Sequence, residues 1–163
     1  MIIRIAKKED MAPLLDIYNY EVENSTATFD LNPKTIEQWS EWFNAHNVDN
    51  HPLIVAEIDS AVAGYASLSS YREKEAYKST VELSVYVHKD YRRKGVATSL
   101  MKEIIRMAKE DSTIHTIVSV ITSENEVSAQ LHYKMGFTYC GTIHQVGEKF
   151  SRYLDISNFE LQV

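Results

Sequence analysis

The chain has 163 residues, 44% of them hydrophobic, and a formal net charge of −6 at pH 7. This size predicts one domain over residues 1–163, and the acidic balance argues against a nucleic-acid partner. No window reaches the roughly 18 apolar residues of a membrane span, and neither a signal-peptide pattern nor a second cysteine beside Cys140 is present, so we expect a cytoplasmic protein.

The N-terminal half alternates apolar runs with helical patterns. Ile2–Ile5 predicts a strand, and Asp10 is a candidate cap for a helix whose apolar positions continue to Val22. Residues 23–30 (ENSTATFD) break that pattern and predict a loop. A second helix is predicted from Pro33.

Residues 53–71 follow with a shorter periodicity. Two apolar runs within them are separated by Asp59 and Ser60, which predicts a β-hairpin.

The C-terminal half carries the clearest patterns. In order they predict a central strand, an amphipathic helix, another strand and a further helix, over residues 80–87, 95–108, 115–121 and 123–135. Ser123 and Glu126 suggest a capping box for the last helix, and two closing strands follow from Phe137. This order predicts an α+β (mixed α/β) fold, a single sheet layer with helices on its faces.

Residues 91–97 (YRRKGVA) form a basic spot where the central strand passes into a helix. The first turn of a helix has backbone N–H groups without internal partners, and its dipole favours an anion there. Gly95 and Ala97 are small enough for a phosphate oxygen to approach these amides. The segment predicts a phosphate-binding turn; a basic turn that only caps a surface helix is the alternative.

This order of elements, with YRRKGVA followed by LHYKMGF at residues 131–137, resembles the GNAT superfamily of N-acetyltransferases. ENSTATF, TVELSVYV and QVGEKFSRYLDI (residues 145–156) make the chain most similar to the phosphinothricin and methionine-sulfoximine acetyltransferases. The resemblance implies a mostly antiparallel sheet of about seven strands with about four helices. It also implies acetyl-CoA as co-substrate, and a homodimer with Phe150 and Tyr153 as a contact.

The resemblance further implies how acetyl-CoA is held. Backbone groups of Val85, Tyr86 and Val87 would pair with the pantetheine arm as if it were an added strand. The residues implied to hold the diphosphate are Arg92, Arg93, Lys94, Gly95, Val96, Ala97 and Thr98. Asn125 is implied to reach the cofactor, and it can equally cap the helix that follows.

Acetyl transfer requires a neutral amine, whereas an alkyl ammonium is neutral to only about one part in 2,500 near pH 7. A positioned general base contributes about 10² to 10⁴ in rate. Glu82 is the only carboxylate in the apolar central strand, on the same face as Ser84 and Tyr86, and we predict that it is this base. The resemblance implies the same role; an ordinary glutamate on a solvated face is the alternative.

His132 stands where many GNAT enzymes place a tyrosine, and the phosphinothricin-type enzymes resemble this chain in having histidine there. We predict that it donates a proton to the leaving thiolate or relays one, since its unperturbed pKa is about 6.5. A structural histidine satisfied by core partners is the alternative. The histidines lack the spacing of a helical metal site, so no metal is expected.

Phe29, Tyr71 and Arg72 are the candidates for the acceptor pocket, because cations beside aromatic rings suit an amino acid. A solvated, charge-alternating loop is the alternative for residues 71–78. We expect an enzyme that acetylates the α-amine of a small amino-acid analogue of phosphinothricin, methionine sulfoximine or methionine sulfone type. Protein N-termini and polyamines are alternative acceptors, and a non-catalytic acetyl-CoA-binding module is the alternative to an enzyme.

Overall fold

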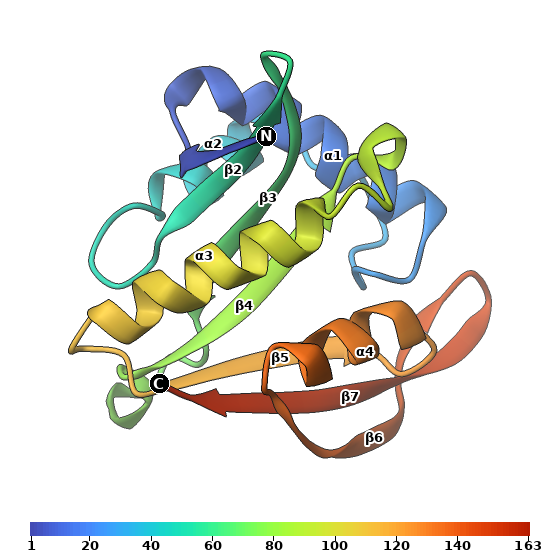
Figure 1. Ribbon diagram of the computed structural model, residues 1–163. Coiled ribbons are helices and arrows are strands. Elements are labelled where there is room, and N and C mark those ends of the chain that lie inside the picture. The colour runs from blue at the N-terminus through green and yellow to red at the C-terminus, as the bar shows by residue number, and fades with distance from the viewer.

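The computed structural model describes residues 1–163 as a seven-stranded sheet with helices on both faces (Figure 1). The strands are β1 (Ile2–Ile5), β2 (Leu53–Ile58), β3 (Ala61–Ser70), β4 (Thr80–Val87), β5 (Thr116–Thr122), β6 (Thr138–Lys149) and β7 (Arg152–Gln162). The helices are α1 (Met11–Asn24), α2 (Ile36–Asn44), α3 (Val96–Glu110) and α4 (Glu126–Lys134). Short 3-10 turns are η1 (Lys8–Asp10), η2 (Glu75–Tyr77) and η3 (Lys89–Tyr91).

The predicted fold class and element order are confirmed. The strand order is β1-β2-β3-β4-β5-β7-β6, and every neighbouring pair is antiparallel except β4 and β5. The predicted hairpin of β2 and β3 turns at Asp59 and Ser60, whose φ angles of 50° and 64° suit a two-residue hairpin turn. No helix is long and apolar enough to cross a membrane.

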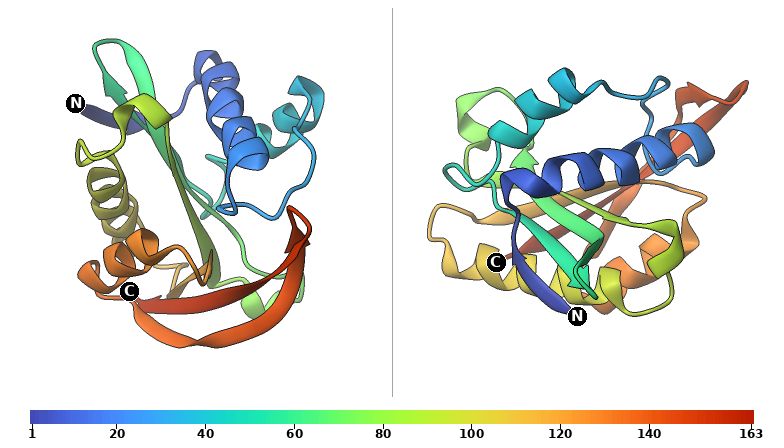
Figure 2. Two further views of the ribbon diagram at one scale, coloured as in Figure 1. Left: turned by 90° about the vertical axis from the view of Figure 1, so that its right-hand side faces the viewer. Right: turned by 90° about the horizontal axis from the view of Figure 1, so that it is seen from above.

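The sheet separates two apolar layers, with α1 and α2 on one face and α3 and α4 on the other (Figure 2, right). Strand alternation sends Val81 and Leu83 of β4 into the layer of α3, against Leu100 and Ile104. Burying each such aliphatic side chain stabilises the fold by about 1.5–3 kcal/mol. Glu82, between Val81 and Leu83, therefore faces α1 and α2.

The sheet is split between its two central strands. β4 and β5 pair only from Thr80 to Glu82, opposite Thr116 to Val118, and then diverge (Figure 1). On its other edge β4 continues to pair with β3 as far as Val87. The β5-facing backbone groups of residues 83–87 consequently have no strand partner, and a gap opens between the two halves.

The loop between α1 and α2 bridges the wide end of this gap, where the end of the β6–β7 hairpin approaches it (Figure 2, left). The Thr122 hydroxyl at the end of β5 donates to the carbonyl of Thr26. Nζ of the buried Lys149 donates to the carbonyl of Thr28 at 2.8 Å. The two sheet halves are thus joined at the narrow end by strand pairing and at the wide end by this loop.

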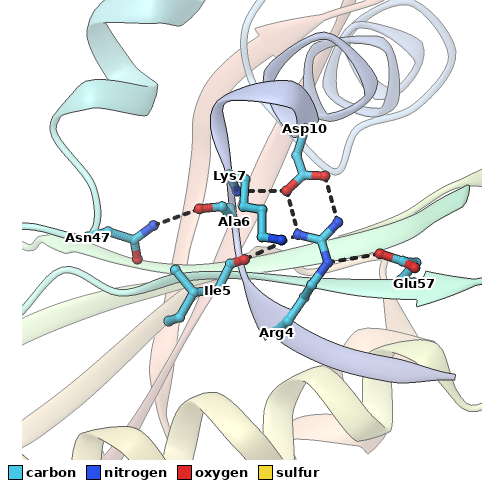
Figure 3. Close-up of polar contacts among 7 residues, drawn as sticks. All are labelled: Arg4, Ile5, Ala6, Lys7, Asp10, Asn47 and Glu57. Atoms are coloured by element: carbon cyan, nitrogen blue, oxygen red, sulfur yellow. Dashed lines mark hydrogen bonds and ion pairs between the residues drawn. The ribbon is translucent and has the colours of Figure 1, made fainter. Parts of the chain in front are cut away.

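Asp10 lies at the start of α1, but its carboxylate does not cap that helix. It accepts both Nη groups of Arg4 at 2.7 and 2.9 Å and the Lys7 N–H at 2.7 Å, while Arg4 Nε binds Glu57 at 2.8 Å (Figure 3). The two-pronged guanidinium gives Asp10 stronger partners than a helix end offers. This cluster fastens β1 to η1 and β2.

The prediction that Ser123 and Glu126 form a capping box is wrong. Asn125 caps α4, accepting the Ser128 N–H at 3.1 Å, whereas the Ser123 hydroxyl is hydrogen-bonded to the Ser157 hydroxyl at 2.8 Å. The neighbouring strand β7 supplies this competing partner, which a local sequence pattern does not reveal.

The start predicted for α2 is also displaced. The helix begins at Ile36 instead of Pro33, because Thr35 accepts the Gln38 N–H and the Gln38 side chain accepts the Thr35 N–H. A reciprocal capping box of this kind marks the N-terminus of a helix.

We predict that Asp10→Asn lowers the free energy of unfolding by about 2–4 kcal/mol near pH 7, because it leaves Arg4 without its buried partner. Burial raises the pKa of Asp10, but the Arg4 and Lys7 donors outweigh it and hold this pKa below its usual value. The stabilisation is therefore complete above about pH 4 and is lost as pH falls through the lowered pKa.

Urea unfolding at about pH 7 and about pH 3 measures this difference, which should shrink at the lower pH. Glu57→Gln is the matched control, because Glu57 binds the same Arg4 in a more exposed position and should cost about 1 kcal/mol or less. Equal losses in the two variants would contradict the role given to Asp10.

Candidate active site

Glu82 lies at the narrow end of the gap, in the last residue pair that joins β4 to β5. Its neighbour on β3 is Ser69, and its side chain is half-buried on the α1 and α2 face. Burial is the one cause that shifts its pKa, which is raised above the usual glutamate value. A carboxylate without a compensating cation, kept partly from water, is suited to accept a proton.

His132 on α4 is buried, 4% exposed, and lies between the rings of Phe137 and Phe159. Its Nδ1 is 2.7 Å from the Ser128 carbonyl oxygen, which can only accept, so Nδ1 carries the proton. Nε2 then accepts from the Ser119 hydroxyl at 2.7 Å. Burial lowers the pKa of His132, although the hydrogen bond to Ser128 opposes this, so the ring is neutral with both nitrogens partnered.

The YRRKGVA turn keeps its helix end open. Gly95 precedes α3 with φ 78°, and a Cβ placed there would meet no atom within 4 Å. The first intrahelical bond is from Ser99 N–H to the Gly95 carbonyl at 3.0 Å, and no side chain caps the helix. The N–H groups of Val96, Ala97 and Thr98 thus lie outside the helical ladder and can donate hydrogen bonds to an anion.

The three cations of this turn differ in their surroundings. Arg92 pairs with the carboxylate of Glu21 on α1, which is buried and also accepts the Ser25 hydroxyl. Lys94 lies over the Tyr91 ring at 5.0 Å, and Arg93 is exposed in a left-handed conformation with φ 61°. The Arg92 side chain therefore ties the turn to α1, whereas Arg93 and Lys94 are exposed cations that pair with no carboxylate of the chain.

The strand segment predicted to hold the pantetheine arm is open along one edge. Val85, Tyr86 and Val87 pair with β3, and nothing pairs with them on the side of β5. Gly64 of β3 lets β4 and the start of α3 both approach closely. A Cβ at this position would lie 2.7 Å from the Tyr86 carbonyl oxygen of β4 and 3.1 Å from the Val96 side chain of α3. The open edge of β4 and the open N-terminus of α3 thus lie next to each other. Asn125, which was predicted to reach the cofactor, caps α4.

The structure separates the three acceptor candidates. Tyr71 and Arg72 lie together after β3, with the guanidinium 4.9 Å from the Tyr71 ring centre and 5.7 Å from that of Tyr77. Phe29 instead packs on Gly147 of the β6–β7 hairpin, where a Cβ would come within 2.3 Å of its ring. Tyr71 and Arg72 follow shortly after the strand partner of Glu82, whereas Phe29 belongs to the loop over the wide end.

Two buried hydroxyls on the same sheet face as Glu82 have no hydrogen-bond partner in the chain. Ser67 lies opposite Ser84, and Tyr65 lies opposite Tyr86. An unpaired buried polar group costs about 1–3 kcal/mol, so this face suits water or a polar ligand.

Ser119 and Glu21 were not identified from the sequence. Ser119 could have been found by the signal that marked Glu82, a polar residue inside an apolar strand. Glu21 gives no such signal, because a glutamate in an amphipathic helix normally faces water. No group of three or more His, Cys, Asp or Glu side chains is arranged to hold a metal ion.

Comparisons with known proteins agree with this geometry. Residues 3–157 match the family described as acetyltransferase (GNAT) domain. An L-methionine sulfoximine/L-methionine sulfone acetyltransferase of Salmonella typhimurium is 36% identical over 165 residues, which cover 100% of this chain and 95% of the relative.

Two solved structures superpose closely. A ribosomal-protein-alanine N-acetyltransferase from Brucella melitensis has a TM-score of 0.96 at 37% identity, covering 100% of both chains. A phosphinothricin acetyltransferase from Sinorhizobium meliloti, in complex with acetyl-CoA, has a TM-score of 0.95 at 28% identity and covers 99% of this chain and 88% of its own. The resemblance seen in the sequence is confirmed, and the chain belongs to the GNAT family of acetyltransferases.

Proposed function

We propose that this chain transfers the acetyl group of acetyl-CoA to the α-amine of a small amino-acid analogue of phosphinothricin, methionine sulfoximine or methionine sulfone type. The observation that carries the proposal is Glu82, a half-buried carboxylate without a compensating cation where β4 and β5 part. Glu82 lies beside the open edge of β4, so a thioester bound along this edge would lie next to the base.

The residues of the gap fit acetyl-CoA, which supplies an acetyl group on a thioester. The open edge at Val85, Tyr86 and Val87 can pair with an amide-bearing arm as a strand would. The turn from Arg93 to Thr98 can hold the diphosphate through its free N–H groups and exposed cations. Arg92 contributes by anchoring this turn to Glu21, and Asn125, which caps α4, is proposed to reach the cofactor.

Glu82 takes a proton from the ammonium of the acceptor, because only the neutral amine can attack; for an alkyl ammonium the neutral form lies about 4.6 kcal/mol higher in free energy near pH 7. The neutral amine attacks the thioester carbonyl, and the C–N bond forms as the C–S bond breaks and leaves its electron pair on sulfur. The second proton of the nitrogen then passes to water, which gives the neutral amide. His132 lies on α4, on the opposite face of the sheet, and is hydrogen-bonded to Ser119. We propose that this pair of residues assists the leaving sulfur. Arg72 can bind the acceptor carboxylate with two N–H groups.

We propose that residues 1–163 work as one N-acetyltransferase domain in a cytosolic homodimer. Phe150 and Tyr153, at the end of the β6–β7 hairpin, are 54% and 64% exposed, and exposed aromatic residues favour association. The unpaired Cys140 supports a reducing compartment.

Peptide α-amines form a second candidate class of acceptor, because the Brucella relative is named for acetylating a ribosomal-protein alanine. Such amines have pKa values of about 7.7–8.0 and need less help from a base. Polyamines are less suited, because the exposed cations Arg72, Lys74 and Lys78 would repel them.

An acceptor screen tests the function directly. Purified protein with acetyl-CoA should release free coenzyme A faster with methionine sulfone than without an acceptor, measured with a thiol reagent. Dipeptides and spermidine are compared at the same concentration. Faster release with dipeptides would favour the second candidate, and equal release with and without every acceptor would favour a non-catalytic acetyl-CoA-binding module.

Glu82→Gln should lower kcat/KM for methionine sulfone by about 10²- to 10⁴-fold, because the amide cannot accept the proton. Since burial raises the pKa of Glu82 and only the carboxylate is active, wild-type kcat/KM should fall as pH is lowered through this raised pKa. In the variant kcat/KM should not show this fall at low pH. Glu103→Gln, a change of a partly exposed glutamate on α3, is the control. If kcat/KM of Glu82→Gln matched the wild type in magnitude and in pH dependence, Glu82 would be excluded as the base.

Arg72→Ala should raise KM for methionine sulfone by roughly 10- to 100-fold with a smaller change in kcat, because a charge-assisted carboxylate contact is lost. The amide of methionine sulfone, which lacks the carboxylate, should not distinguish the variant from wild type. Arg106→Ala is the control, since Arg106 is an exposed arginine that pairs with Glu103 and Glu110 on α3. An unchanged KM in Arg72→Ala would place the carboxylate elsewhere.

A further inference from the structure

Ser119 lies where the gap begins. The pairing of β4 with β5 ends at Glu82 and Val118, so Ser119 is the first residue of β5 whose β4-facing side borders the gap. Its side chain is 2% exposed and points to the face of α4, because it contacts His132. A hydroxyl is thus held beside the gap on the face opposite Glu82.

The direction of the hydrogen bonds around Ser119 follows from a backbone carbonyl. Because Nδ1 of His132 must donate to the Ser128 carbonyl, Nε2 of the neutral ring can only accept. The Ser119 hydroxyl is then the donor across the 2.7 Å to Nε2. The neutral His132 ring has no N–H left to offer to a sulfur atom, whereas the Ser119 O–H can rotate.

We propose that Ser119 supplies the hydrogen bond to the leaving sulfur of coenzyme A, and that His132 is a positioning residue that acts through Ser119. This inference rests on the proposed acetyl transfer. As the C–S bond breaks, its electron pair stays on sulfur, and the Ser119 O–H turns from Nε2 to that anion. No covalent bond of the protein changes, and the thiolate takes its proton from water.

The energetic order of the two hydrogen bonds supports this rotation. A hydrogen bond to an ionised acceptor is roughly twice as strong as one between neutral groups. The hydroxyl therefore rests on His132 while the thioester is uncharged and moves to the sulfur when charge develops there. A contact that strengthens in this way lowers the barrier instead of tightening substrate binding.

The pKa of bound coenzyme A is a readout that a purely structural role would not change. We expect Ser119→Ala to raise the pKa of the bound thiol by roughly 1–2 units, a 10- to 100-fold change in its ionisation constant, because the thiolate loses a donor. The ultraviolet absorbance of the thiolate, followed in a pH titration of the complex with coenzyme A, measures this shift. Equal thiol pKa values in wild type and variant would overturn the proposal.

Steady-state kinetics give the second readout. Ser119→Ala should lower kcat roughly 10- to 100-fold with little change in KM for acetyl-CoA, and Ser119→Thr, which keeps a hydroxyl, should recover most of the loss. Ser157→Ala is the control: Ser157 is a buried serine on β7, hydrogen-bonded to Ser123. A loss in Ser119→Thr as large as in Ser119→Ala would indicate packing and contradict the proposal.

The double variant separates the roles of the two residues. In His132→Gln the amide oxygen can still accept from Ser119, so kcat should fall less than in Ser119→Ala. Ser119→Ala/His132→Gln should be no slower than Ser119→Ala, because both residues act through one hydroxyl. If the fold loss in kcat of the double variant equalled the product of the two single losses, His132 would have an independent role, and its assignment as a positioning residue would be overturned.

The same measurements distinguish this inference from the proposed function. If the wild type neither binds coenzyme A nor releases it with any acceptor, the acetyl transfer is wrong and the inference fails with it. If the wild type binds and turns over, and Ser119→Ala matches it in kcat and thiol pKa, only the role of Ser119 is wrong.

Discussion

The parting of β4 from β5 after three residue pairs is the constraint on which the rest of the structure depends. It leaves a run of backbone donors and acceptors without strand partners inside a sheet, an arrangement that is unfavourable unless water or a ligand satisfies them. α3 supports one face of this opening, α1 and α2 support the other, and the loop over the wide end prevents the halves from separating. An unpaired strand edge of this kind can pair with an extended ligand.

The charged groups divide into those that hold the fold and those left free for chemistry. Two buried carboxylates, Asp10 and Glu21, are each matched by a guanidinium, from Arg4 and Arg92. Glu82 has no such partner, and burial alone raises its pKa. Leaving a half-buried carboxylate uncompensated costs stability, but it gives a group of increased proton affinity, which is the property that the proposed role as a base requires.

Particular residues show how far the sequence could predict this site. Glu82 was identified because alternation in an apolar strand separates it from its neighbours, and the structure places it on the predicted face. The YRRKGVA turn was identified by its charge and small residues, yet the partner of Arg92 lies 71 positions earlier, on α1. Phe29 was grouped with Tyr71 and Arg72 by chemical type alone, and in the structure it packs on Gly147, apart from these two residues. Ser123 matched a capping pattern, but a serine on β7 engages its hydroxyl.

The sequence by itself determined the order of the elements, the family and the faces of each strand, because periodicity and short motifs depend on residues close together in the chain. Only the tertiary structure decided which side chains from distant segments meet. The Ser119–His132 contact, the Glu21–Arg92 pair and the loop that closes the wide end each join segments brought together by folding. Such contacts depend on where strands split and helices pack, and local spacing carries no information about that.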